Sequence, residues 1–187
     1  MLYRAAATVA LLTALSAPAH ADEISDTIQS ALDAYNAGDT QYAAEELAFA
    51  QQLLKAMKTD DLAAFLPAAP DGWTREIDDQ MGASLGMMGG GVGAAADYDS
   101  GSESITITIM ADNPMVTAMA SMMGNPVLMA SVGKIVRVGR QKFLDQDGDL
   151  SALINNRVLV RAEGADPELM IPLLETIDYK ALGNFGN

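Results

Sequence analysis

Apolar residues recur at helical spacing near the N-terminus and at alternating spacing farther along the chain. Ile28, Leu32 and Tyr35 stand four and three residues apart, which is the spacing of one face of an amphipathic helix. Asn36-Ala37-Gly38-Asp39 then supplies a helix stop followed by a capping residue. A second series at helical spacing consists of Ala44, Leu47, Ala48, Gln51, Leu54 and Met57. The pattern predicts two antiparallel helices joined by a short turn, a helical hairpin over residues 22–66.

The period changes beyond residue 66. Two prolines and an Asp-Gly pair within residues 67–72 cannot continue a helix, so this segment is predicted to be a linker. Strict alternation in Ile105-Thr106-Ile107-Thr108-Ile109 places the isoleucines on one face of a strand and the threonines on the other. Turn signals at 100–102, 147–148 and 155–156 separate further segments of this kind. The predicted strands are 73–78, 94–99, 103–111, 134–145 with a kink at Gly139, 150–154 and 157–163.

Two helices are predicted among and after these strands. Residues 113–132 read as a helical segment that crosses between strands. Asp166 and Pro167 suit the cap and first turn of a closing helix, with Leu169, Leu173 and Ile177 as its apolar stripe. The fold class is therefore α+β: an N-terminal helical hairpin followed by an antiparallel sheet of roughly five to seven strands with a crossover helix and a C-terminal helix. The sheet domain is expected over residues 73–182, with a tail at 183–187.

The first 21 residues read as a cleavable bacterial secretion signal. Arg4 supplies the positive charge, residues 5–17 are an uncharged apolar run, and Ala19-His20-Ala21 has the small-x-small pattern of a cleavage site. Cleavage after Ala21 predicts a periplasmic protein. The chain has no cysteine, so a lipobox is absent and the mature protein is expected to be soluble, without a lipid anchor.

Charge and residue types exclude several classes of function. The formal net charge of −14 leaves no basic footprint for nucleic acid. Cleavage would remove His20, the single histidine, so His-based triads and His-ligated zinc are excluded from the mature chain. Carboxylate pairs such as Asp60-Asp61 lie in segments typical of solvated surface. We therefore predict a non-enzymatic accessory or binding protein without a cofactor, whose partner is an envelope protein or a membrane surface.

A glycine- and methionine-rich segment is one candidate contact site. Residues 81–96 contain six glycines and no charge, which is typical of a long flexible hairpin tip. No Lys-Ser/Thr pair follows, so the segment does not fit a phosphate-binding loop. An exposed apolar tip would suit a membrane or protein partner, and an inert loop is the other interpretation. The residues of this possible contact tip are Met87, Met88, Gly89, Gly90 and Gly91.

Methionines in the crossover helix give the alternative function. Met115, Met119, Met122 and Met123 fall at i, i+4, i+7 and i+8, on one helical face. Thioethers are soft ligands that could hold Cu(I), or the face could bind an apolar ligand. Packing of the stripe against a sheet of isoleucines, as ordinary core, is the competing interpretation.

Two further patterns lead to structural interpretations. No charge occurs between Asp112 and Lys134, but Gly124-Asn125-Pro126 favours a buried helix broken at Gly124, and no transmembrane segment is expected in the mature chain. Residues 145–156 resemble an EF-hand loop at three positions. They lack the glycine and the glutamate that calcium geometry requires, so an Asp-rich turn is predicted.

The order of elements resembles the PsbP/Mog1-like sandwich of small secreted proteins. The resemblance covers residues 67–182 and is carried by Gly72-Trp73, Tyr98, Asn113-Pro114-Met115 and Ile177-Asp178-Tyr179. It extends to uncharacterised exported proteobacterial proteins. Such a fold implies an accessory or binding module. In the hairpin, residues 35–47 resemble one tetratricopeptide-like helix pair without a second copy, which cannot form a solenoid.

Overall fold

The computed structural model describes residues 19–87, 89–123 and 133–186 of the chain. Contacts divide the chain into two compact units, with the border between Leu53 and Leu54. This border lies inside a helix, whereas the sequence analysis places the division at residues 67–72. The two units are described separately below.

The N-terminal unit is a helical hairpin. Helix α1 runs over Ala19–Asn36, and α2 runs over Thr40–Ala63, so its last turns belong to the second unit. Gly38 adopts a φ of 84° in the connecting turn, a conformation that suits glycine. The Asp39 side chain accepts a hydrogen bond from the Tyr42 backbone N–H at 3.0 Å and caps α2. The predicted stop, cap and hairpin are confirmed.

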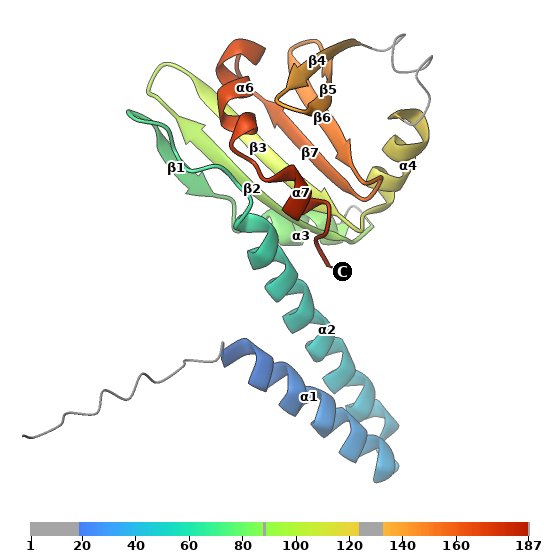
Figure 1. Ribbon diagram of the computed structural model, residues 1–187. Helices are drawn as coiled ribbons and strands as arrows, with labels where there is room; N and C mark the ends of the chain where they lie inside the picture. Colours follow the sequence, from blue (N-terminus) through green and yellow to red (C-terminus); the bar gives the residue numbers. More distant parts are fainter. Residues whose placement is uncertain (1–18, 88, 124–132, 187) are drawn as a thin grey trace, which may run out of the picture. The chain divides into compact units, whose positions relative to one another are not determined.

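The second unit is built on one sheet of seven antiparallel strands, drawn in Figure 1. Its order is β1-β2-β3-β7-β6-β5-β4, so β1 and β4 form the two edges. The α+β fold class is confirmed. The strands are β1 Thr74–Ile77, β2 Val92–Asp99, β3 Ser104–Ala111, β4 Lys134–Val138, β5 Gln141–Gln146, β6 Asp149–Ile154 and β7 Val158–Glu163.

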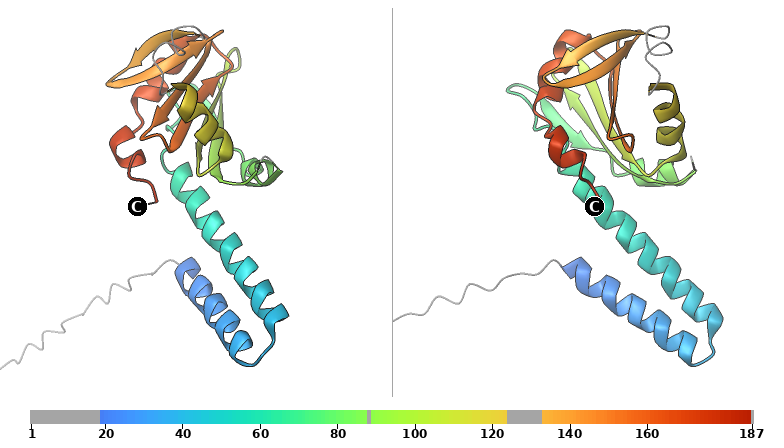
Figure 2. Two further views of the ribbon diagram at one scale, coloured as in Figure 1. Left: turned by 90° about the vertical axis from the view of Figure 1, so that its right-hand side faces the viewer. Right: turned by 45° about the vertical axis from the view of Figure 1, so that its right-hand side comes forward.

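One face of the sheet carries the main hydrophobic core. Ile105, Ile107 and Ile109 of β3 are fully buried on this face, while the threonines between them are partly exposed. Two C-terminal helices, α6 (Pro167–Glu175) and α7 (Tyr179–Leu182), cover it together with Leu62 and Leu66. Figure 2 shows these helices on one side of the sheet, opposite α3 and α4. The alternation predicted for β3 is thereby confirmed.

The other face of the sheet carries a smaller core. Helix α3 (Met81–Met87) contributes Leu85 and helix α4 (Pro114–Met123) contributes Val116. These side chains pack against Met110 of β3 and Leu159 of β7. The second cluster therefore lies over the centre of the sheet, where β3 and β7 pair.

Three sequence expectations need correction. The predicted kinked strand 134–145 is two strands, β4 and β5, joined by a tight turn at Gly139 and Arg140. The segment 81–96, expected to be a flexible hairpin tip, contains helix α3 and the start of β2. Leu169 is 40% exposed, and its neighbour Met170 is buried in the core instead, because α6 turns its Met170, Leu173 and Leu174 side toward the sheet.

Two segments that flank the strands pack into the sheet domain, which the sequence does not indicate. Phe185, which the sequence analysis places in a tail, is buried in the main core. Pro67 of the expected linker is buried, and its carbonyl accepts a hydrogen bond from the Tyr98 hydroxyl at 2.7 Å.

The predicted helix 113–132 is observed as α4 up to Met123, and its remainder lies outside the described residues.

The Tyr98 hydrogen bond leads to a first prediction. Tyr98→Phe removes the buried donor and leaves the Pro67 carbonyl without this partner, which should lower the free energy of unfolding by about 1–2 kcal/mol. Urea unfolding at neutral pH, followed by tryptophan fluorescence, measures the change. An unchanged midpoint and slope would contradict the structural role assigned to this hydroxyl.

The same hydroxyl sets a pH dependence. Burial raises the pKa of Tyr98 from 10.0 to about 12, and burial also raises the pKa of Tyr179. The unfolded chain therefore ionises first as the pH rises. The stability that the protonated Tyr98 hydroxyl contributes to the folded state is fully present below pH 10 and is lost between pH 10 and about 12. We expect Tyr98→Phe to show a shallower loss over this range than the unmodified protein, and equal slopes would contradict the expectation.

Candidate functional site: the exposed faces of the helical hairpin

Small residues form the contact between the two hairpin helices. On α1 the buried positions are Ile24, Thr27, Ala31 and Ala34, at helical spacing along one stripe. On α2 the matching stripe contains Ala43 and Ala50, both buried. Alanine has no side chain beyond Cβ, so the buried alanines contribute little side-chain surface to this contact. Little apolar surface is removed from water by such a contact.

The large apolar side chains of the hairpin point outward. Ile28 is 46% exposed, Leu32 51% and Tyr35 66%, and each follows a buried residue of the α1 stripe by one position. One position is about 100° around a helix, so these three side chains form a second stripe beside the contact. Leu47 on α2 is 49% exposed and follows partly buried Glu46 in the same way.

These side chains lie on one side of the hairpin. In an antiparallel pair, the positions that follow the contact stripe on both helices turn to the same side, because the helices have the same hand and opposite directions. Ala44, which follows Ala43, belongs to this side and is exposed. We call this surface the apolar face, and its residues are Ile28, Leu32, Tyr35, Ala44 and Leu47.

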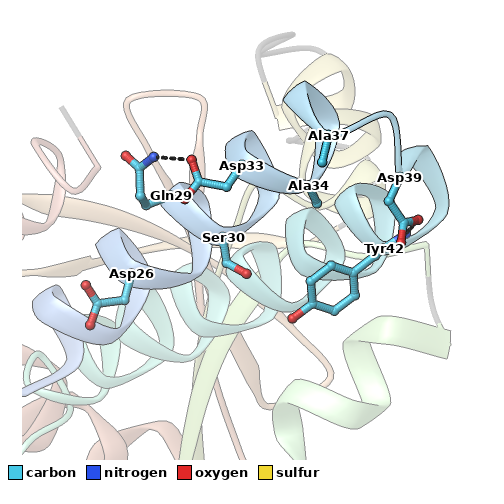
Figure 3. A pocket seen from close by; sticks show the side chains of 8 residues that line it. All are labelled: Asp26, Gln29, Ser30, Asp33, Ala34, Ala37, Asp39 and Tyr42. Carbon is cyan, nitrogen blue, oxygen red and sulfur yellow. Dashed lines mark hydrogen bonds between the residues drawn. The ribbon is translucent and has the colours of Figure 1, made fainter.

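The opposite side of the hairpin has a different character. Tyr42 and Phe49 precede the buried alanines of α2 and are each 45% exposed. Asp26, Ser30 and Asp33 precede the buried residues of α1. We call this surface the acidic face. An open groove of about 570 Å³ lies here. Figure 3 draws the side chains that line it, which are those of Asp26, Gln29, Ser30, Asp33, Ala34, Ala37, Asp39 and Tyr42.

Contacts within the acidic face are few and local. The Gln29 side-chain amide donates a hydrogen bond to Asp33 Oδ1 at 2.9 Å, as Figure 3 shows. Asp39 is occupied as the cap of α2. All charged side chains between residues 19 and 53 are carboxylates, namely Asp22, Glu23, Asp26, Asp33, Asp39, Glu45 and Glu46. The hairpin is therefore a strongly anionic element.

The sequence of α1 contains two apolar stripes, and periodicity alone does not show which of them packs against α2. Two adjacent stripes of α1 both have helical spacing, one of small residues with Ile24 and one of large residues. The larger stripe is the natural candidate for the helix contact. The structure places the smaller stripe in the contact and leaves Ile28, Leu32 and Tyr35 exposed.

The candidate contact tip lies close to the second core cluster. Met87 ends α3, and Met88 lies outside the described residues. The Asn113 side-chain amide donates a hydrogen bond to the Gly90 carbonyl. A Cβ added to Gly91 would stand 2.8 Å from Asn113 Cβ, and one added to Gly89 would stand 3.4 Å from Pro114 Cγ. These glycines therefore pack against the junction between β3 and α4.

The methionine face of α4 is described in part. Met115 is 43% exposed, while Met119 is partly buried against the second cluster. Met122 and Met123 belong to the last turn of α4, and their side chains lie outside the described residues. The two described methionines thus have different surroundings, one in solvent and one against Leu85, Val116 and their neighbours.

Several charged residues of the sheet form ion pairs or hydrogen bonds within it. The Arg161 guanidinium lies 2.5 Å from Asp149 and 2.6 Å from Glu163, and the hydrogen bond to Asp149 raises the pKa of Arg161. In the Asp-rich turn, Asp145 accepts a hydrogen bond from the Gly148 backbone N–H at 3.1 Å. Arg137 and Lys142 stand directly opposite each other on β4 and β5, at the edge of the sheet.

The described segments contain neither a cluster of metal-ligating side chains nor a helix that could span a membrane. No group of three or more His, Cys, Asp or Glu side chains in this part of the chain could hold a metal ion. No helix of residues 19–87, 89–123 and 133–186 is long and apolar enough to cross a membrane.

The stability of the hairpin should separate its contact stripe from its apolar face. The double change Leu32→Ser and Leu47→Ser affects exposed positions and should alter the free energy of unfolding by less than about 0.5 kcal/mol each. Ala31→Leu enlarges a buried residue of the contact and should destabilise the hairpin by about 1–3 kcal/mol. Hydrogen exchange of the α1 amides measures both effects. Strong loss of protection in the serine variant would show that the apolar face is part of the hairpin's own core.

Two glycines form a matched pair for testing the tip. Gly91 has a φ of 98°, and a Cβ there would approach Asn113 and the Ala111 carbonyl to below 3.0 Å. Gly101 has a φ of 85° with nothing within 4 Å. Gly91→Ala should therefore destabilise the sheet domain by about 1–3 kcal/mol more than Gly101→Ala, which carries backbone strain alone. Thermal unfolding compares the two variants, and equal melting temperatures would indicate a loose tip.

Comparison with known proteins gives no relative for this chain. No protein-family model matches it, and no curated protein or solved structure does. The resemblance to PsbP/Mog1-like proteins therefore stays a prediction.

Proposed function

We propose that this chain is an exported, non-catalytic binding protein of the bacterial periplasm, and that its helical hairpin docks on another envelope protein. The observation that carries the proposal is the orientation of the hairpin's apolar residues. Leu32 is 51% exposed and Leu47 is 49% exposed, while alanines occupy the contact between the helices. A contiguous exposed apolar surface is typical of a protein interaction site.

The sheet domain supplies a separate argument for binding. Its main core holds the end of α2 through Leu62, which is fully buried. The groups with raised pKa values in this unit, Tyr98, Tyr179 and Arg161, are each engaged in a structural hydrogen bond. Perturbed groups at a catalytic site would instead face a cleft. These features fit a scaffold that carries the hairpin.

The export and the lack of histidine in the mature chain remain parts of the proposal. Both rest on the interpretation of residues 1–21 as a secretion signal that is cleaved after Ala21. This cleavage removes the single histidine, His20. An exported domain without histidine and cysteine has few groups suited to general acid–base or nucleophilic catalysis. Binding is the function that needs none of them.

Site-specific photo-crosslinking in the producing bacterium tests the proposal. We place p-benzoylphenylalanine at Leu32 on the apolar face and, as a control, at Gln52, an exposed polar position of α2. A discrete adduct with an envelope protein is expected from Leu32 and not from Gln52. Leu47→Ser in the same chain should reduce the adduct, because Leu47 shares the face.

Two results at the Leu32 position would overturn the proposal. Absence of an adduct from Leu32, or equal adducts from both positions, would exclude the hairpin as the docking element. A Leu32 adduct that is insensitive to Leu47→Ser would indicate a chance encounter at one side chain.

A further inference from the structure

We propose that strand β4 is a second interaction edge, which binds an extended acidic segment of a partner protein as an added antiparallel strand. This edge belongs to the sheet domain, and the proposal does not depend on the function proposed for the hairpin. Two observations carry it together, the backbone groups that β4 leaves open and the positive charge on the same edge.

Strand β4 has one open side. It is the outermost strand of the sheet, beside β5, as Figure 1 shows. Val138 and Gln141 close the two-residue turn between these strands. Residues that close such a turn exchange hydrogen bonds, and bonded pairs alternate with non-bonded pairs along an antiparallel ladder. The N–H and C=O groups of Ile135 and Arg137 therefore point away from β5, and no donor or acceptor in the described segments meets them.

The side chains of Ile135 and Arg137 share one face of the sheet. Val136 and Val138 pack against the main core, and successive residues of a strand point to opposite faces. Ile135 is 41% exposed, and Arg137 is exposed as well. A strand that pairs with this edge would therefore meet one apolar and one cationic side chain, two residues apart on the same face.

The charge of Arg137 is not compensated by the neighbouring strand. Arg137 stands directly opposite Lys142 of β5, and like charges in a cross-strand pair are unfavourable. The pair is a non-bonded one, in which the side chains lie closest. Asp145 is the single carboxylate of β4 and β5, and it lies on the other face, opposite Lys134. The face of Arg137 and Lys142 is therefore purely cationic on these two strands.

Ion pairs elsewhere do not neutralise this edge. Lys134, Arg137, Arg140 and Lys142 are exposed, and none of them forms a salt bridge within the described segments. The carboxylate of Glu175, at the end of α6, accepts a hydrogen bond from the backbone N–H of the β4–β5 turn at 3.2 Å. The chain, whose net charge is −14, thus keeps a cationic edge on its sheet.

An acidic strand fits both features of this edge. Its backbone would pair with the outward groups of Ile135 and Arg137, as in other complexes that add a strand to a sheet. An aspartate or glutamate opposite Arg137 would form a cross-strand pair of opposite charge, which is stabilising. An apolar residue two positions away would meet Ile135. The expected segment therefore carries an acidic and an apolar residue two positions apart.

Other roles of the edge make different predictions. Pairing of two β4 strands from two copies of this chain would bring their Arg137–Lys142 pairs together, and like charges oppose that contact. Anionic lipid would attract the cations but has no backbone to pair with the strand. Cations on an edge strand can also serve only to prevent pairing, and in that role they would not lead to binding of an acidic strand.

Synthetic peptides test the proposal. The probe is a fluorescent peptide of about nine residues, in which glutamate and valine alternate on one face of the strand and threonine occupies the other. Fluorescence anisotropy measures its Kd for the full-length purified chain. One control replaces glutamate by lysine. Two further peptides carry N-methyl groups, either on the glutamate and valine nitrogens, which would donate to β4, or on the threonine nitrogens, which would point away from it.

Matched protein variants identify the edge. Arg137→Gln with Lys142→Gln removes the opposed cations, and Lys55→Gln with Lys180→Gln changes the net charge equally outside β4 and β5. We expect the Kd of the glutamate peptide to rise about fivefold or more in the first variant and less than about twofold in the second. Thermal unfolding checks the fold, and loss of the like-charge pair should not lower the melting temperature.

The peptides should also differ among themselves. The glutamate peptide should bind at least about fivefold more tightly than the lysine peptide, and its Kd should rise as NaCl is raised from about 50 mM to about 500 mM. Methylation of the glutamate and valine nitrogens should abolish binding, whereas methylation of the threonine nitrogens should preserve it.

Each other result overturns the proposal in a specific way. Equal binding of the glutamate and lysine peptides removes the role of charge. Equal binding of the two methylated peptides shows attraction between charges without an added strand. If the peptide does not bind and the variant without Arg137 and Lys142 forms dimers in sedimentation, the cations only prevent pairing. Binding to phosphatidylglycerol vesicles in the absence of peptide binding makes a lipid surface the occupant.

Discussion

Burial of alanine positions between α1 and α2 determines how the rest of the hairpin is exposed. A helix has room for one contact stripe, and Ala31, Ala34, Ala43 and Ala50 occupy it. The larger residues one position later must then turn away from the contact. The hairpin consequently has two chemically different sides, and its own core is too small to use the apolar surface that its sequence carries.

The sheet domain follows the opposite arrangement. Here the large apolar residues point inward, because the strand period of two places Ile105, Ile107 and Ile109 on the same face, beneath α6 and α7. Leu85, Val116 and their neighbours protect the centre of the second face. One unit of the chain thus buries its apolar surface within itself, and the other presents it. This contrast is the physical basis for our proposal that the hairpin binds a partner.

Sequence patterns predict the elements better than their contacts. Alternation identifies β3 without ambiguity, and the Asn-Ala-Gly-Asp stop locates the hairpin turn. The same periodicity cannot decide which of two neighbouring helical stripes packs, since both repeat at the same interval and the choice depends on how closely the partner helix approaches. Helix α3 is also hidden from local pattern, because its two glycines disfavour a helix and its position depends on the packing of its Leu85 against Met110 and Leu159, which are distant in the sequence. Residues 134–145 look continuous until the φ of 56° at Gly139 turns the chain back.

Helix α2 is a single helix of 24 residues whose C-terminal part carries Leu62 into the sheet core. Starting a helix is the unfavourable step, and extending one is nearly neutral. The C-terminal turns of α2, which pack in the sheet core, therefore act as a nucleus from which the helix extends toward the hairpin turn. A surface element with few buried contacts of its own is in this way kept ordered, so the docking that we propose would not have to bear the entropy of folding it.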